Sequence, residues 1–127
     1  MKNDRMFLRC EVCSNIVGMV HDSGVTPVCC GKPMTLLTPN TVDAAKEKHV
    51  PVGEVDGNTL TVTVGSVTHP MTEEHHIAWI AIAQGSHTQR ISLDHTGEPN
   101  AVFTINPDSP VTIFEYCNLH GLWAVDL

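Results

Sequence analysis

The chain has 127 residues, of which 42% are hydrophobic and 17% are charged. This composition suffices for the core of one ordinary domain, or of a modest domain with a small appendage, and it excludes an intrinsically disordered chain. Fourteen acidic residues against seven basic ones give a net charge of -7, which argues against a general nucleic-acid binder. The longest apolar run, 77–83, is too short for a transmembrane helix, which needs about 20 residues.

The first residues indicate no secretory signal, since only three apolar residues follow the charged stretch 1–5 before charge returns. We therefore expect a cytoplasmic protein that does not bind a membrane. Five cysteines and eight histidines are unusual in so short a chain. An odd number of cysteines fits poorly with a fully disulfide-bonded framework, and in a reducing compartment clustered cysteines bind metal or react. The two counts together point to metal chemistry.

Residues 1–37 hold four of the five cysteines and many turn-forming residues. Two short strand-like segments, 15–20 and 25–28, flank the polar residues 21–24 and predict a β-hairpin. A segment this small cannot offset its own conformational entropy, so it needs a cross-link, and the cysteines are the only candidates for one. We expect a separate small domain over 1–37, followed by a linker over 38–44.

The remainder of the chain, 45–127, is predicted to be a second domain. Strand-like segments recur about every ten residues and are separated by turn-forming residues. They cover residues 59–64, 76–83, 88–93, 101–105 and 111–117. The pattern favours at most a short helical turn near 43–48. Short strands at this spacing are typical of an antiparallel β-sandwich, so the chain is predicted to be all-β.

The first four cysteines have the spacing of a metal site. Cys10 and Cys13 form a knuckle, in which a tight turn directs two sulfurs onto one ion. Cys29 and Cys30 are adjacent and pair poorly in a disulfide, but both can reach a shared tetrahedral centre. Soft sulfur donors select zinc, iron or cuprous copper. The residues alone leave open an iron, a structural zinc, or buried or disulfide-bonded cysteines.

A second set of candidate ligands lies in the region of the predicted sandwich. Cys117 and His120 form a C-x-x-H pair at a strand end and in the turn after it. His69 and His75 flank a stretch that Pro70 interrupts, which favours a loop folding back over a metal rather than one face of a helix. C-x-x-H pairs and loop histidines of this kind can hold one metal together.

The other histidines are weak candidates one by one, because a single histidine is more often a surface or core residue than a ligand. His49 lies in the same region and is kept as a candidate ligand. His76 directly follows His75 and would point to the opposite side of an extended strand, so we interpret it as a residue beside the site. Three histidines in polar, turn-like surroundings are not assigned to the site: His21, His87 and His95.

Residues 6–37 resemble the desulforedoxin domain, a small module that holds one iron in four cysteine thiolates. The resemblance rests on CEVC at 10–13 and on VCCGKPM at 28–34. It implies that one iron is bound by four residues: Cys10, Cys13, Cys29 and Cys30. Ser14 stands where relatives often have glycine, which does not affect these ligands.

Four further stretches, in this order, resemble the superoxide reductases, and the whole chain is similar to desulfoferrodoxin, the two-iron form of that family. They are KEKHVP at 46–51, VGSVTHPM at 64–71, HHIAWI at 75–80 and EYCNLHGLW at 115–123. The resemblance implies an immunoglobulin-like β-sandwich that holds a second iron through four equatorial imidazoles and one axial thiolate. The implied ligands are His49, His69, His75, His120 and Cys117.

The resemblance implies the activity of a superoxide reductase. Five ligands leave one octahedral position open, where superoxide would take one electron from ferrous iron and leave as hydrogen peroxide without release of oxygen. Lys48 would attract the anion within about 8 Å, one Debye length at physiological salt, because the net charge has the wrong sign for steering over longer distances. Glu47 would occupy the open position of the oxidised iron. His76 and Leu122 depart from the family pattern, which would alter the surroundings of the iron but not its ligands.

The resemblance also implies a rubredoxin-like electron donor and a homodimer, and zinc is able to replace iron in either site. A non-enzymatic iron or copper electron-transfer protein is the main alternative, but a blue-copper site needs a weak axial methionine and none follows Met71. A zinc-binding module leaves the residues after His49 unexplained. A superoxide dismutase must also oxidise superoxide, whereas a thiolate-rich site favours the reductive half-reaction.

Overall fold

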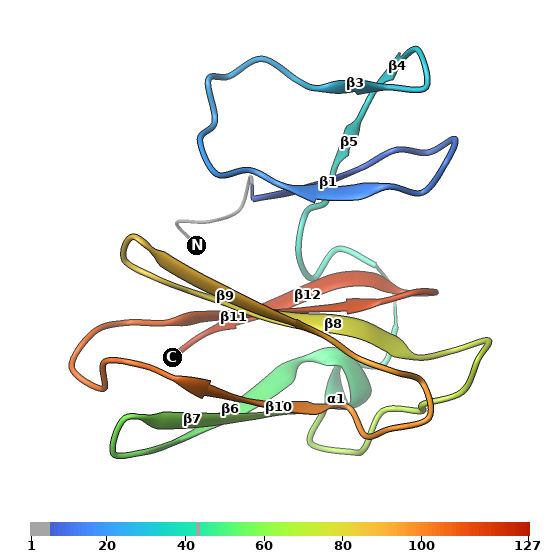
Figure 1. The fold of residues 1–127 in the computed structure, drawn as a ribbon. Helices are drawn as coiled ribbons and strands as arrows, with labels where there is room; N and C mark the ends of the chain where they lie inside the picture. Colours follow the sequence, from blue (N-terminus) through green and yellow to red (C-terminus); the bar gives the residue numbers. More distant parts are fainter. Residues whose placement is uncertain (1–5, 43) are drawn as a thin grey trace. The chain divides into compact units, whose positions relative to one another are not determined.

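The computed structural model describes residues 6–42 and 44–127 (Figure 1). The chain divides into two compact units, Met1–Pro39 and Asn40–Leu127, which are described separately below. The regular structure is almost entirely β, so the predicted fold class is confirmed: small N-terminal sheets followed by an antiparallel β-sandwich. Among the residues that the structure describes, we find no helix with the length and hydrophobicity of a membrane span.

The first unit contains two small antiparallel sheets. In one, β1 (Phe7–Arg9) pairs with both β2 (Ile16–Gly18) and β5 (Thr35–Leu36). In the other, β3 (Val28–Cys29) pairs with β4 (Lys32–Pro33). Three buried side chains form the core of this unit: Leu8, Cys10 and Met34.

The predicted hairpin between 15–20 and 25–28 is wrong, because two tighter turns close instead. β2 pairs with β1, and the backbone N–H of Cys10 donates to the carbonyl of Asn15 at 2.8 Å across the knuckle that joins them. β3 pairs with β4 through Cys30 and Gly31, whose φ angles are 53° and 74°. Two positive φ angles match the twist of a two-residue hairpin. Each cysteine pair thus has a hairpin of its own.

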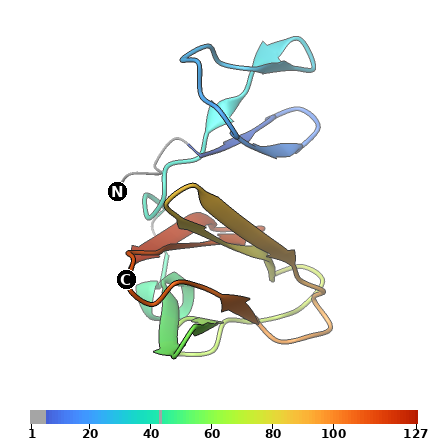
Figure 2. The same cartoon turned by 60° about the vertical axis from the view of Figure 1, so that its left-hand side comes forward.

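The second unit is a sandwich of two antiparallel sheets (Figures 1 and 2). One sheet has the strand order β10-β7-β6 and the other β12-β11-β8-β9. The strands are β6 (Pro51–Asp56), β7 (Thr59–Val64), β8 (Ile77–Gln84), β9 (His87–Ser92), β10 (Asn100–Thr104), β11 (Thr112–Cys117) and β12 (Gly121–Asp126). The short helix α1 (Lys46–His49) precedes β6.

The core of the sandwich follows from the alternation of side chains along the strands. In β7, Leu60, Val62 and Val64 are buried, and the threonines at 61 and 63 are exposed. The buried side chains pack against Ile80 and Ile113 of the facing sheet. Period-two alternation of this kind gives a strand one core face and one solvent face.

The ends of several strands meet at one end of the sandwich. β6 begins where β7 ends, and β8 and β12 begin where β11 ends. The two ends adjoin, since Nε2 of His49, just before β6, lies 3.0 Å from Nδ1 of His120, just before β12. The loop 65–76, which joins β7 to β8, leaves from this end as well.

Candidate metal centres

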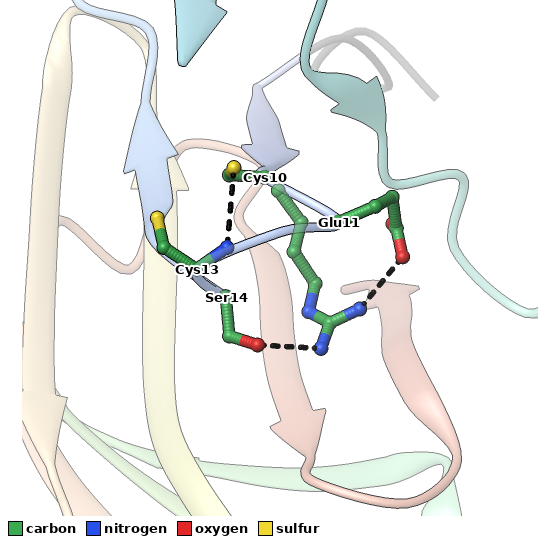
Figure 3. A network of polar contacts seen from close by, with 5 residues as sticks. Cys10, Glu11, Cys13 and Ser14 are labelled. Carbon is green, nitrogen blue, oxygen red and sulfur yellow. Dashed lines mark hydrogen bonds and ion pairs between the residues drawn. The ribbon is translucent and has the colours of Figure 1, made fainter. Parts of the chain in front are cut away.

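Four cysteine sulfurs converge in the first unit. The sulfurs of Cys10, Cys13, Cys29 and Cys30 all lie within 4.8 Å of one another, and none of these cysteines is in a disulfide. The backbone N–H of Cys13 donates to the sulfur of Cys10 at 3.4 Å, which closes the knuckle (Figure 3). The side-chain amide of Asn15 donates to the sulfur of Cys29 at 3.8 Å.

The ionisation of these thiols shows that the cluster fits a cation. Hydrogen bonds from the backbone N–H groups of Cys13 and Val12 lower the pKa of Cys10 to about 6. Hydrogen bonds with Cys13 and Cys10 raise the pKa of Cys29, and they raise that of Cys30 to about 12. One thiolate therefore opposes the ionisation of its neighbours. Four thiolates at this spacing require a bound cation, and sulfur donors favour a soft one.

Arg9 makes two side-chain hydrogen bonds to residues of the turn that contains Cys10 and Cys13. Its guanidinium donates to the carboxylate of Glu11 and to the hydroxyl of Ser14, both at 3.0 Å (Figure 3). Ser14 has a φ of 67°, the left-handed conformation in which glycine is common, and its backbone N–H donates to the carbonyl of Cys10 at 2.9 Å. The serine thus keeps the backbone of the turn and adds a side-chain contact.

Imidazoles and a thiol converge at the end of the sandwich described above. The ligand atoms of His49, His69, His75 and Cys117 all lie within 4.8 Å of one another. His120 adjoins this group: its Nδ1 is 3.0 Å from Nε2 of His49 and 3.9 Å from the sulfur of Cys117. His49 ends α1, His69 and His75 lie on the loop 65–76, and His120 lies in the turn after β11.

The four imidazole rings form a square. Neighbouring rings are nearly perpendicular, with centroids 4.6 Å apart for His49–His69, 4.7 Å for His69–His75, 4.9 Å for His75–His120 and 4.8 Å for His120–His49. Across the diagonal, His49 and His75 are 6.2 Å apart and nearly parallel. The sulfur of Cys117 lies within 4.8 Å of the ligand nitrogens of His49, His69 and His75 and 3.9 Å from Nδ1 of His120, so it could bind the same ion as a fifth ligand.

The nitrogen atoms that face the centre of the square fit a metal ion. Nδ1–H of His49 donates to the carbonyl of Ala45, and that of His69 to the carbonyl of Pro70, both at 2.7 Å. Both Nε2 atoms then carry a lone pair, yet they lie 3.1 Å apart. Two nitrogens bound at right angles, each about 2.1 Å from one ion, would lie about 3.0 Å apart. Nε2 of His75 is buried and has no hydrogen-bond partner among the described residues.

Burial sets the protonation of these ligands. It lowers the pKa of His49 and His75, and it lowers that of His69 to about 4. The three imidazoles are therefore neutral at neutral pH and can bind a metal. Burial raises the pKa of Cys117, and two backbone N–H groups of the following turn partly offset this. A metal that binds the sulfur must displace its proton.

A β-bulge brings Cys117 to the site. Tyr116 pairs with Trp79, but the next residue, Cys117, pairs with Ile77, so Ala78 is an extra residue in β8. A bulge bends a strand and redirects a side chain, and bulges are frequent next to active sites. The side chain of Cys117 is fully buried at this point.

Trp123 contacts two residues of the square and was not among the predicted site residues. Its buried ring stacks on His49, with centroids 5.1 Å apart, and its Nε1–H donates to the carbonyl of His120 at 3.1 Å. Its signal in the sequence is its place at the end of the stretch EYCNLHGLW, three residues after His120. The contact shows that β12 helps to support two of the imidazoles.

Glu47 and Lys48 are exposed on α1, next to His49. The charge of Glu47 raises the pKa of His49 and that of Lys48 lowers it. Lys48 also lowers the pKa of His75. Both charges therefore act on the imidazoles of the square, and the roles predicted for the two side chains stay predictions.

The remaining histidines belong to neither cluster of candidate ligands. His76 directs Nδ1–H to the carbonyl of Thr72 at 2.9 Å, and its ring lies 6.0 Å from that of His95. Its backbone N–H and carbonyl are both hydrogen-bonded to Asn118. These contacts place His76 beside the site.

Two family models match the chain over nearly its whole length. Residues 41–126 match the family model described as Desulfoferrodoxin, and residues 3–37 match the model of the desulfoferrodoxin N-terminal domain. The chain belongs to the desulfoferrodoxin family.

Relatives of this family cover nearly the whole chain. The chain is 50% identical to a desulfoferrodoxin of Syntrophotalea carbinolica over 116 residues, which are 91% of each chain. It is 45% identical to a desulfoferrodoxin of Nitratidesulfovibrio vulgaris over 126 residues, 99% of each chain. Among solved structures it is similar to the superoxide reductase of Treponema pallidum, with a TM-score of 0.76 and 39% identity over 93% of this chain and 98% of that one.

Proposed function

We propose that this protein is a superoxide reductase, which reduces superoxide by one electron to hydrogen peroxide at an iron in the His/Cys site. The observation that carries the proposal is the square of four imidazoles with the sulfur of Cys117 close to the ligand nitrogens of all four. The similarity to the Treponema pallidum superoxide reductase over most of both chains supports it. The proposed ligands are His49, His69, His75, His120 and Cys117.

Ferrous iron bound in this site supplies the electron in the overall reaction of superoxide, one electron and two protons to hydrogen peroxide. The chain itself sets the conditions for the reaction. An imidazole that binds a metal is neutral and adds no charge, so one thiolate would leave a ferrous site with a net charge near +1, which would attract an anion. Five protein ligands would leave room for one more on the bound iron, and substrate would bind there.

Lys48 is proposed to attract superoxide to the site. The net charge of -7 repels an anion at long range, so a local cation has to act close to the iron. Replacing Lys48 with alanine is expected to lower the second-order rate constant with superoxide by about tenfold or more, the lower end of electrostatic steering effects. The dependence of this rate constant on ionic strength should weaken as well. Stopped-flow or pulse-radiolysis kinetics at several salt concentrations measure both.

Lys46 is the matched control for Lys48, since it is an exposed lysine on the same short helix. Its replacement with alanine removes the same charge without removing the side chain next to His49. The rate constant of this variant should stay close to that of the unmodified protein. Equal effects of both substitutions would contradict a specific role for Lys48.

Glu47 is proposed to bind the oxidised iron at the open position. Its support is its place next to His49, whose pKa its charge raises. Replacing Glu47 with alanine is expected to change the visible spectrum of the oxidised site and to leave the rate constant of the reduced site with superoxide nearly unchanged. Absorption spectra of the oxidised variant test this, and a spectrum identical to that of the unmodified protein would exclude the ligand role.

The four-cysteine unit is proposed to hold a second iron that transfers electrons. Its four sulfurs would fill a tetrahedral site and leave no position for substrate. We further propose that a rubredoxin-like protein donates electrons, that the chain forms a homodimer, and that it works in the cytoplasm, where its five free thiols would persist. Analytical ultracentrifugation tests the dimer.

The proposed function is tested by metal analysis together with spectroscopy of the purified protein. Two irons per chain are expected, one for each ligand cluster, with sulfur-to-iron charge-transfer bands. When the reduced protein is mixed with superoxide in a stopped-flow instrument, the sulfur-to-iron charge-transfer band of the oxidised His/Cys site should appear during the reaction. An iron-loaded protein that stays reduced in the presence of superoxide would exclude the activity.

A further inference from the structure

The ligands of the His/Cys site come from chain segments that are distant in sequence and need a link between them. The loop 65–76 carries His69 and His75, and the turn 117–120 carries Cys117 and His120. The described contacts between this loop and this turn include three hydrogen bonds made by one residue, Asn118.

Asn118 uses its backbone and both ends of its side-chain amide. Its backbone N–H donates to the carbonyl of His76 at 3.2 Å, and its Oδ1 accepts from the backbone N–H of His76 at 2.8 Å. Its Nδ2 donates to the carbonyl of Glu74 at 3.0 Å. Asn118 therefore bonds the residue before His75 and the residue after it.

These bonds continue the strand pairing past its last regular position. Cys117 pairs with Ile77 at the end of the β8–β11 ladder, and the bulge in β8 precedes this pair. An asparagine amide carries an acceptor and a donor side by side, as a peptide group does, so it can replace one peptide of a ladder. β11 ends at Cys117, and the chain then turns toward His120. The side chain of Asn118 continues the hydrogen bonding between β11 and the segment before β8 by one more step.

The other side of His75 is fixed by Thr72. The hydroxyl of Thr72 accepts from the backbone N–H of His75 at 3.1 Å and donates to its carbonyl at 3.2 Å. The backbone of His75 is thus held by Thr72, and its two neighbours are held by Asn118. The imidazole of His75 is only half-buried, and its Nε2 has no hydrogen-bond partner among the described residues. The orientation of this ring therefore depends on the hydrogen bonds that hold the backbone around His75.

We propose that Asn118 is a positioning residue of the His/Cys metal site, which fixes the distance between the His75 imidazole and the Cys117 sulfur. The inference rests on the proposed function only in that it concerns the same metal site. Asn118 contacts no ligand atom of the site in this proposal. It acts through the backbone on either side of one ligand and through its covalent bond to another.

Replacing Asn118 with aspartate tests the two hydrogen bonds of its side chain separately, because it keeps one and removes the other. The variant keeps an oxygen that can accept from His76, but a carboxylate oxygen then faces the carbonyl of Glu74, where the amide donated. Replacing Asn118 with alanine removes both bonds. Supporting hydrogen bonds around metal ligands typically contribute about 10- to 100-fold in metal affinity. We expect a loss of Co²⁺ affinity in this range, larger for alanine than for aspartate.

The experiment uses Co²⁺ as the probe in the full-length protein. Competition with a chelator gives the dissociation constant, and absorption spectra give the sulfur-to-cobalt charge-transfer band and the ligand-field bands of the His/Cys site. Both Asn118 variants should bind Co²⁺ more weakly and show altered ligand-field bands. Co²⁺ in the four-cysteine unit gives an internal standard whose affinity should not change.

Leu119 is the control in the same turn, because its side chain is 58% exposed. Replacing Leu119 with alanine should leave the affinity and spectrum of the His/Cys site unchanged. Unchanged affinity and spectrum in both Asn118 variants would overturn the proposal, even if the metal-free variants unfolded more readily. Superoxide is not used in this test, so a failure of the proposed activity would not be mistaken for a failure of the positioning role.

Discussion

Replacing Cys117 with serine is expected to abolish the sulfur-to-iron charge-transfer band of the His/Cys site and to remove most of its activity. A hydroxyl remains protonated where a thiolate would donate charge to the iron, and the site loses the fifth ligand. Loss of a supporting contact typically costs about 10- to 100-fold in metal affinity or activity, and loss of a ligand should exceed this range. Visible spectra and the rate constant with superoxide measure the two effects.

Two control measurements show whether the loss of the charge-transfer band and of activity is caused by the loss of the sulfur. A buried hydroxyl costs about 1–3 kcal/mol if it is unpaired, but two backbone N–H groups of the following turn donate to the side chain at position 117, so the free energy of unfolding of the metal-free variant, measured with urea, should fall by no more than about 1–3 kcal/mol. Replacing the exposed Leu119 with alanine should leave both band and rate unchanged. A serine variant with an unchanged charge-transfer band would contradict the assignment of Cys117 as a ligand.

Replacing Gly65 with alanine is expected to cause the largest loss of stability among glycine substitutions near the site. Gly65 has a φ of +82°, and an added Cβ would lie 2.4 Å from the carbonyl oxygen of Val67 and 2.7 Å from those of Glu47 and Lys48. Left-handed strain costs about 1–2 kcal/mol and overpacking about 1–3 kcal/mol. We therefore expect a loss of about 2–5 kcal/mol in the free energy of unfolding, measured with urea.

We expect this loss of stability because the turn after β7 packs closely against α1, the helix that carries His49. The backbone N–H of Val67 and the hydroxyl of Ser66 both donate to the carbonyl of Glu47, at 2.8 and 3.3 Å. A side chain at position 65 would push the turn away from α1. The alanine variant should therefore also bind metal more weakly at the His/Cys site.

Gly57 provides the matched control. It has a similar φ of +59°, but an added Cβ meets nothing within 4 Å. Replacing it with alanine should cost only the strain of about 1–2 kcal/mol and leave metal affinity unchanged. Equal losses of stability at positions 57 and 65 would show that the close carbonyls do not matter.

The sequence predicted the sandwich well where strands alternate. The segment 59–64 coincides with β7, whose buried residues alternate with threonines, and four other predicted segments overlap β8 to β11 within one residue at each end. β6 and β12 were not predicted. Gly53 interrupts the pattern of β6, and β12 has consecutive buried residues at 122–124, so neither shows the period-two signal.

The N-terminal unit was harder to predict because its strands are only two or three residues long. The hairpin prediction relied on apolar residues near 15–20 and 25–28, but the turns at Cys10–Asn15 and Cys30–Gly31 decide the pairing. A positive φ at Cys30 cannot be read from composition, since cysteine has no preference for that conformation. The spacing of the cysteines carried more information than the strand pattern.

The candidate ligands came from motifs and resemblance, and the structure adds how they are arranged. No spacing rule states that His49 and His75 lie on opposite corners of a square, because the order depends on how the loop 65–76 folds over the end of the sandwich. The contacts of Trp123 and Asn118 depend on strand register and on the bulge in β8. Such contacts have no signature in a single sequence.

The oxygen balance of the reaction with superoxide tests most directly whether the His/Cys site reduces superoxide. Fully reduced, iron-loaded protein is mixed with excess superoxide in the absence of any reductant, and oxygen and hydrogen peroxide are measured against the spontaneous reaction. A superoxide reductase should form one hydrogen peroxide for each ferrous iron that is oxidised, at most two per chain because the proposed four-cysteine iron can pass its electron to the His/Cys iron, and it should then stop without having released oxygen. Continuous catalytic release of oxygen would show that the site disproportionates superoxide and would contradict the proposed reductase.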